Sequence, residues 1–181
     1  KGGLDGNFIE GGLDAIVNSK NDRIRFFTVQ KNASLKPLDN IKGKWEKADP
    51  STSGSFGAVG YFFAQQLEKV LEVPIGIIVT AWGASSAEAW TDSSTLNDLG
   101  LELPEKMAKM KQQTPSVLYN AMIHPLIGYG MKGILWYQGE SNRHNAEQYE
   151  QIINAMVTSW RKKWNNRDFP FYYAQIAPFN Y

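Results

Sequence analysis

Short runs of β-branched and aromatic residues alternate along this chain with longer segments of helical periodicity, and this alternation constrains the fold most. The runs at residues 23–29, 74–82, 131–138 and 169–178 predict strands, and PIGIIVTAW (74–82) shows no polar alternation. Such a run is typical of a parallel strand that is covered on both faces. We therefore predict an α/β fold, a three-layer α/β/α sandwich with a mostly parallel sheet.

Three segments have the periodicity of amphipathic helices, namely residues 56–72, 116–130 and 145–164. In the last of them, Asn145 fits the N-cap position, and basic residues near the end suit the helix dipole. In the first, one apolar stripe is expected to face the core, formed by Val59, Phe62, Phe63, Leu67, Val70 and Leu71.

Two polar stretches separate these elements. Residues 35–55, rich in Pro, Gly and Ser, predict a long surface loop, and residues 93–115 predict an irregular or helical excursion whose charged part, 102–113, is a solvated face. The sequence shows no internal repeat, and 181 residues of which 43% are hydrophobic can form a sizeable core. We predict a single domain over residues 1–181.

Composition excludes several classes of function. A formal net charge of +1 without an evident basic face argues against nucleic acid as a partner. The sequence contains no run of about 18 apolar residues, so no membrane span is predicted. The absence of Cys excludes disulfides and thiolate chemistry within this chain. The chain has two His and no acidic ligand spacing around them, so no metal site is expected.

Glycine and polar residues are crowded directly after two of the predicted strands. Gly83 follows the run at 74–82, and the run at 131–138 ends in Gln138, Gly139, Glu140, Ser141 and Asn142. Ligands bind at the carboxyl ends of parallel strands, so we expect both loops to open onto the same edge of the sheet. A glycine there permits unusual backbone geometry and close approach to the main-chain N–H, and side-chain amides can face developing negative charge.

The segments VPIGIIVTAWGASSAEAW and NAMIHPLIGYGMKGILWYQGESN resemble the sialate O-acetylesterase family of the SGNH hydrolase superfamily. The resemblance extends to IRFFTV, GKWEKADP and FGAVGYFFAQQL. It implies a flavodoxin-like SGNH hydrolase fold and hydrolysis of O-acetyl esters of sialic acid or a related sugar through a serine nucleophile, without metal or cofactor. It also implies a periplasmic or secreted location, by family habit alone.

By this resemblance, the N–H of Gly83 would belong to an oxyanion hole, and the QGESN segment would supply a side-chain amide to the same hole. Gln138 is favoured as that amide because it stands at the end of the predicted strand, and Asn142 is the alternative. Removing one such donor typically costs about 3–4 kcal/mol of transition-state stabilisation.

Ser85, Glu140 and His144 are candidates for contact with the substrate, and each also has a structural interpretation. The segment GAS begins like a nucleophile elbow, but Ala87 stands where the second Gly of that motif would be, so Ser85 is expected to bond loop backbone instead. Glu140 beside an oxyanion would repel the developing charge, so it is expected to hold the loop. His144 is expected to be solvated, and His124 to be a hydrogen-bonded structural residue.

The family's nucleophile lies in an N-terminal GQSN-like block, and its catalytic His, with an Asp shortly before it, lies in a C-terminal block. Neither block has a counterpart between the opening KGGLDGNF and the closing APFNY. A Ser is a weak nucleophile until a His accepts its proton. We therefore expect this chain to be the central part of an esterase, inactive alone, with the complete gene supplying both blocks. An acetylxylan esterase, another SGNH hydrolase and a non-catalytic glycan-binding relative are the alternatives.

Overall fold

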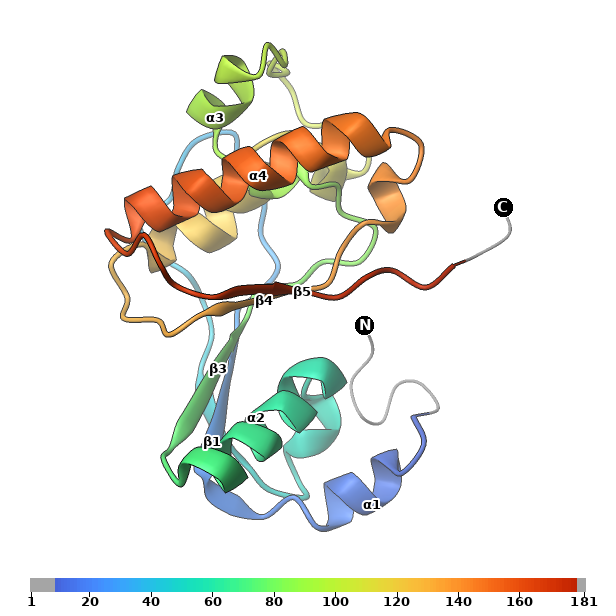
Figure 1. Ribbon diagram of the computed structural model, residues 1–181, viewed down its shortest axis with the longest axis vertical. Coiled ribbons are helices and arrows are strands. Elements are labelled where there is room, and N and C mark those ends of the chain that lie inside the picture. The colour runs from blue at the N-terminus through green and yellow to red at the C-terminus, as the bar shows by residue number, and fades with distance from the viewer. Residues whose placement is uncertain (1–8, 179–181) are drawn as a thin grey trace. The chain divides into compact units, whose positions relative to one another are not determined.

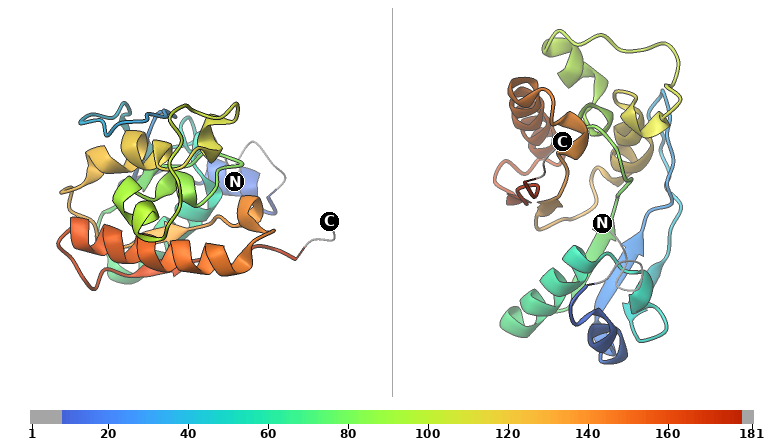
Figure 2. Two further views of the ribbon diagram at one scale, coloured as in Figure 1. Left: turned by 90° about the horizontal axis from the view of Figure 1, so that it is seen from above. Right: turned by 90° about the vertical axis from the view of Figure 1, so that its right-hand side faces the viewer.

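The computed structural model describes residues 9–178, which divide into two compact units (Figures 1 and 2). Unit 1 consists of residues 9–30 and 42–81, and unit 2 consists of residues 31–41 and 82–178. The opening KGGLDGNF and the last three residues lie outside the described residues. The single esterase domain expected over the whole chain stays a prediction.

A three-stranded sheet and two helices form unit 1. Its strands are β1 (Asn21–Thr28), β2 (Trp45–Ala48) and β3 (Ile75–Val79), in the order β2-β1-β3. Strand β1 is antiparallel to β2 and parallel to β3. The helices are α1 (Gly12–Val17) and α2 (Ala58–Leu71), with a 3₁₀ turn at Ser53–Ser55, and α2 lies along the sheet (Figure 2).

Tyr61 and the small residues Gly60 and Ala64 of α2 face the core of unit 1. Tyr61 and Ala64 are fully buried, and a Cβ placed on Gly60 would lie 3.3 Å from the side chains of Phe26 and Ile77. The expectation that the large apolar residues of this helix form the buried stripe is therefore wrong in part, since the small residues are what allow the helix to approach the sheet. The members of the predicted stripe that are exposed are Val59, Phe62, Val70 and Leu71.

The predicted strand at 23–29 and the predicted helix at 56–72 are confirmed as β1 and α2. The prediction of a loop over residues 35–55 is wrong at residues 45–48, which form β2. Trp45 of this strand packs on Phe27 with ring centroids 5.5 Å apart. The parallel pairing of β3 is confirmed, but its side chains are only partly buried because it is an edge strand of its sheet.

Unit 2 is built around a long helix and a pair of parallel strands. The strands are β4 (Ile134–Trp136) and β5 (Phe171–Tyr173), and the helices are α3 (Ser93–Asp98) and α4 (Ala146–Lys163). Shorter helical turns connect them, at Glu88–Trp90, Lys111–Gln113, Tyr119–Ile123, His124–Leu126 and Glu140–Asn142.

Helix α4 runs along β4 and β5 and supplies much of the core of this unit (Figure 1). Ile152 and Met156 are fully buried, and the ring of Trp160 meets that of Trp136 edge-on at 6.2 Å. The predicted N-cap is confirmed, because Asn145 accepts a hydrogen bond from the Gln148 N–H at 3.2 Å.

The predicted helix at 116–130 is shorter than expected, with a π-helical turn at Tyr119–Ile123 and a 3₁₀ turn that contains Pro125. Proline lacks the N–H that a continuing helix needs. The runs at 131–138 and 169–178 are strands only at their centres. The α/β class is confirmed, in small sheets of mixed direction, and the three-layer sandwich stays a prediction. Within residues 9–178, no helix has the length and apolar character needed to cross a bilayer.

Replacing Phe26 by Ala tests the core of unit 1. Phe26 is 1% exposed and stacks on Phe56 with ring centroids 4.2 Å apart, so its removal leaves a large cavity. We expect the free energy of unfolding to fall by about 3–5 kcal/mol in urea titrations. As a matched control, Phe62→Ala on the exposed face of α2 should cost less than about 1 kcal/mol. Equal losses in the two variants would contradict this assignment of the core.

Candidate functional site

Two loops of unit 2 carry the residues that the sequence singles out. The glycine loop (residues 82–92) contains Gly83 and Ser85, and the amide loop (residues 138–142) contains Gln138 and Asn142. Neither loop is an extended strand, since both fold into short 3₁₀ turns at Glu88–Trp90 and Glu140–Asn142.

Hydrogen bonds join the two loops directly. Gln138 Nε2 donates to the carbonyl oxygen of Ser85 at 3.0 Å. The Ala87 N–H donates to Asn142 Oδ1 at 2.9 Å, and Asn142 Nδ2 donates to Glu88 Oε2 at 2.9 Å. The two loops thus come together as expected, but β3 and β4 belong to separate sheets, so the shared sheet edge stays a prediction.

The partners determine how both side-chain amides are oriented. Asn142 turns its oxygen to the Ala87 N–H, which only donates, and its nitrogen to the Glu88 carboxylate, which accepts. Gln138 Nε2 then faces two acceptors, Asn142 Oδ1 at 2.8 Å and the Ser85 carbonyl oxygen. Both hydrogens of the Gln138 amide are therefore used, whereas the Asn142 amide retains one hydrogen without a partner among the described residues.

A tyrosine of α4 fixes the end of β4. The Tyr149 hydroxyl donates to the carbonyl oxygen of Gln138 at 2.7 Å and accepts from Trp136 Nε1 at 3.3 Å. Burial raises the pKa of Tyr149, so it remains a neutral donor. Gln138 itself is 7% exposed, and its Oε1 is buried without a hydrogen-bond partner. Sequence reasoning missed Tyr149, because its place in the first turns of α4 gives no sign that it reaches back to the strand.

Gly83 lies where a ligand can approach its backbone. It is exposed, a Cβ added to it would meet no atom within 4 Å, and its N–H donates no hydrogen bond to any described residue. The unusual backbone geometry that we expect at Gly83 occurs instead at Ala84, whose φ is 58°. The role of Gly83 in an oxyanion hole stays a prediction.

Ser85 has a structural contact, but with a side chain instead of the loop backbone that we expected. Ser85 is 6% exposed, and its Oγ accepts a hydrogen bond from Trp90 Nε1 at 2.8 Å. Likewise, His124 Nδ1 lies 3.1 Å from the carbonyl oxygen of Leu38, as a hydrogen-bonded structural histidine should. Trp136 is a core residue, with 9% exposure.

The other two candidates for substrate contact lie at and just beyond the amide loop. Glu140 is half-buried, and its backbone oxygen accepts a hydrogen bond from Arg143 Nη1 at 2.9 Å. His144 is exposed in the turn before α4. Their contact with a substrate stays a prediction.

A hollow of about 310 Å³ opens where the two loops meet, and we call it the loop hollow. Gln113 reaches it from the segment predicted to be a solvated face, and its Nε2 donates to the carbonyl oxygen of Ala84 at 3.2 Å. Sequence reasoning missed this residue because nothing in its neighbourhood marks it off from other polar positions. The lining residues are Ser86, Glu88, Gln113, Pro115, Ser141 and Asn142.

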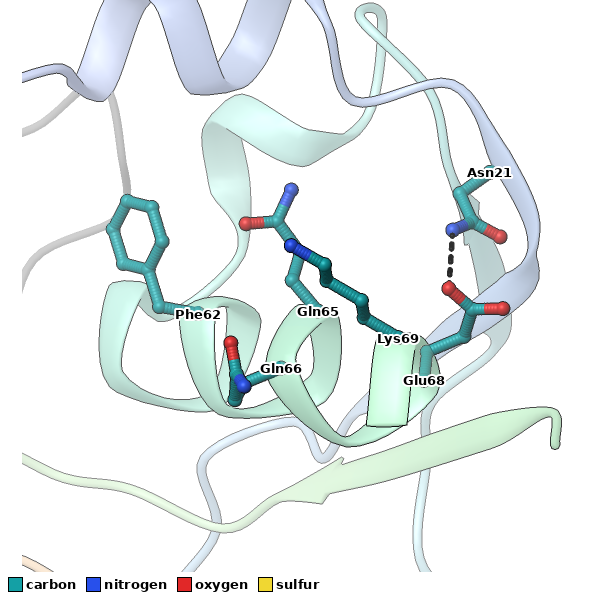
Figure 3. A pocket seen from close by; sticks show the side chains of 6 residues that line it. All are labelled: Asn21, Phe62, Gln65, Gln66, Glu68 and Lys69. Atoms are coloured by element: carbon teal, nitrogen blue, oxygen red, sulfur yellow. Dashed lines mark hydrogen bonds between the residues drawn. The ribbon is translucent and has the colours of Figure 1, made fainter. Parts of the chain in front are cut away.

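A second hollow, of about 580 Å³, lies in unit 1 along α2 (Figure 3). Its lining includes the Glu68 carboxylate, which accepts a hydrogen bond from Asn21 Nδ2 at 3.4 Å. None of the residues predicted to act on a substrate lines it. In the described part of the chain, no three His, Asp or Glu side chains gather in a way that could hold a metal ion.

The glycine loop ends at Asp92, whose buried carboxylate binds α3 and α4. It accepts hydrogen bonds from the Thr95 N–H at 3.2 Å, as the N-cap of α3, and from Ser159 Oγ of α4 at 2.6 Å. Burial acts to raise the pKa of Asp92, but the hydrogen bonds from Ser159, Ser94 and Thr95 outweigh it and lower the pKa to about 2.

Comparison with known proteins shows the family to which the chain belongs. Residues 16–181 match the profile of the family described as carbohydrate esterase, sialic acid-specific acetylesterase. The human sialate O-acetylesterase is 32% identical over 165 residues, covering 82% of this chain and 32% of the relative. The crystal structure of a carbohydrate acetylesterase from Xanthomonas citri superposes with a TM-score of 0.82 at 37% identity, covering 90% of this chain and 36% of that one.

The chain therefore belongs to the family of carbohydrate esterases that includes the sialate O-acetylesterases. A structure from Arabidopsis thaliana shares the fold, with a TM-score of 0.50 at 21% identity, over 84% of this chain and 56% of that one. The chain spans about a third of the length of the human relative and of the Xanthomonas structure.

Replacing Asp92 by Asn tests how the glycine loop is anchored. The pKa of Asp92 is lower in the folded protein than its ordinary value of 3.8, so its contribution to stability is present above about pH 4 and is lost as the pH falls toward 2. At pH 7 we expect Asp92→Asn to lower the free energy of unfolding by about 2 kcal/mol. Urea titrations between pH 2 and pH 7 should show the two proteins converging at the acidic end. A difference independent of pH would contradict the assignment.

Proposed function

We propose that this chain is the central part of a carbohydrate O-acetylesterase that hydrolyses O-acetyl esters of sialic acid or a related sugar. Membership of the carbohydrate esterase family supports the reaction class. The observation that carries the proposal is the junction of the two loops, where Asn142 lines a polar hollow and keeps one amide hydrogen unpaired. Such a hydrogen is what an ester carbonyl needs as it gains negative charge.

In the proposed reaction a serine oxygen attacks the carbonyl carbon of the acetyl group, and the carbonyl oxygen becomes an oxyanion. The sugar hydroxyl then leaves with a proton, and water releases acetate from the acetyl-serine in a second step. The serine and its His–Asp partners are proposed to come from parts of the complete protein outside this chain. This chain contributes donors to the oxyanion and walls to the site.

We assign the side-chain donor to Asn142 rather than to Gln138, which the sequence favours. The two hydrogens of Gln138 Nε2 are taken by the Ser85 carbonyl oxygen and Asn142 Oδ1, so donation to an oxyanion would require one of these bonds to break. Asn142 needs no such rearrangement, and its bond to the Glu88 carboxylate holds the amide in place, at the cost of repulsion between that carboxylate and the oxyanion. The exposed N–H of Gly83 is the proposed backbone donor.

The test is acetate release by the complete gene product from p-nitrophenyl acetate and from O-acetylated sialic acid and neutral sugars. We expect Asn142→Ala to lower kcat by about 10²–10³-fold because one donor to the oxyanion is lost, and to lower Tm because three hydrogen bonds of the loop junction are lost with it. KM should change by less than about threefold, since the interaction belongs to the transition state. Absence of acetate release from every ester would overturn the proposed function.

Two further variants make the assignment specific. Asn154→Ala removes an exposed asparagine of α4 and should leave kcat unchanged. Gln138→Ala should lower kcat together with Tm, because it removes one hydrogen bond between the loops and one within the amide loop. If Asn142→Ala cost less than about threefold while Gln138→Ala cost about 10²-fold at unchanged Tm, Gln138 would be the donor.

A further inference from the structure

We infer that Tyr149 is a positioning residue of the proposed reaction, because its hydroxyl holds the amide loop and so keeps the Asn142 amide directed at the oxyanion. This inference rests on the proposed function and adds to it a residue that does not line the loop hollow. Tyr149 lies in the first turns of α4, and its hydrogen bonds reach Asn142 through the backbone of the amide loop.

The Tyr149 hydroxyl can donate in one direction only. An indole N–H always donates and a carbonyl oxygen always accepts. The hydroxyl therefore accepts from Trp136 Nε1 at 3.3 Å and gives its own hydrogen to the Gln138 carbonyl oxygen at 2.7 Å. Trp136 is itself fixed, since its buried ring packs edge-on against that of Trp160. The core of unit 2 thus directs the hydroxyl at one backbone atom of the amide loop.

That atom is close in the backbone to the group that orients Asn142. The Asn142 N–H donates to the carbonyl oxygen of Gly139, the residue after Gln138, at 2.9 Å. The Asn142 carbonyl oxygen accepts from the N–H of Asn145, the N-cap of α4, at 3.1 Å. Asn142 is therefore held on one side by the segment that the Tyr149 hydroxyl binds, and on the other by the start of the helix that carries Tyr149.

The amide loop also packs closely against this hydroxyl. Gly139 is buried, and a Cβ added to it would lie 3.7 Å from the Tyr149 hydroxyl oxygen and 3.0 Å from Ile176 Cγ2. Removing the hydroxyl would take a donor from the carbonyl group of a buried residue, and an unpaired buried carbonyl is costly. We expect the loop to shift toward another donor, and Asn142 to move with it.

A small shift of Asn142 would affect the chemical step. Donors stabilise an oxyanion when they already face it as the charge develops. A displacement of about 1 Å caused by a mutation away from the reacting atoms can lower a rate by about 10²-fold. The unpaired hydrogen of the Asn142 amide is proposed to act in the transition state, so the loss should appear in kcat and much less in KM.

The test is a double-mutant cycle on the complete gene product, with p-nitrophenyl acetate as substrate and at a temperature well below every Tm. We expect Tyr149→Phe, which removes only the hydroxyl, to lower kcat by at least about tenfold and to change KM by less than about threefold. In the Asn142→Ala background the same substitution should change kcat by less than about twofold, because the amide that Tyr149 positions is gone. The control is Tyr172→Phe, which removes an exposed hydroxyl of β5 and should leave kcat unchanged.

Hydrogen exchange gives a readout that does not depend on activity. Tyr149→Phe should speed the exchange of the backbone amides of residues 139–142 and leave those of β1 unchanged. Unchanged exchange in the amide loop would overturn this inference. So would an equal loss of kcat in both backgrounds, because Tyr149 would then act independently of Asn142. Faster exchange in the loop together with no acetate release by the wild type would overturn the proposed function, while the hold of Tyr149 on the loop would stand.

Discussion

The side-chain amide of Asn142 is the interaction on which the candidate site depends. It accepts from the Ala87 N–H and from Gln138 Nε2, and it donates to the Glu88 carboxylate. Two of these bonds join the glycine loop to the amide loop, and the third orients the Gln138 amide. Partly buried amides held between groups of fixed polarity have little rotational freedom, so the donors are oriented before any ligand arrives.

The sequence predicted the class of fold and the meeting of the two loops, because both follow from where apolar runs end. It did not predict which face of α2 is buried, since close approach to the sheet favoured Gly60 and Ala64 over larger apolar side chains. Nor could it choose between Gln138 and Asn142. That choice depends on how many hydrogens each amide has already donated, and those bonds join residues more than 50 positions apart.

The residues that sequence reasoning missed share one property. Tyr149 reaches the amide loop from the helix that follows it, and Gln113 reaches the glycine loop from a 3₁₀ turn. Each bonds a backbone carbonyl oxygen instead of a side chain. A carbonyl oxygen is present at every position, so no pattern of residue types marks the one that will be used. Motifs therefore located the two loops of this member of the carbohydrate esterase family, and only the structure revealed the residues that support them.

Gln138 donates a hydrogen bond to Asn142, and Asn142 donates one to Glu88. This arrangement would be altered by deamidation of Asn142. Deamidation converts an asparagine amide into a carboxylate without changing its shape. At Asn142 the new carboxylate would face that of Glu88 across the 2.9 Å now spanned by a hydrogen bond, and two such charges cannot both persist at that distance. One of the two carboxyl groups would have to take up a proton for the loops to stay together, so the change of a single atom would make the junction sensitive to pH.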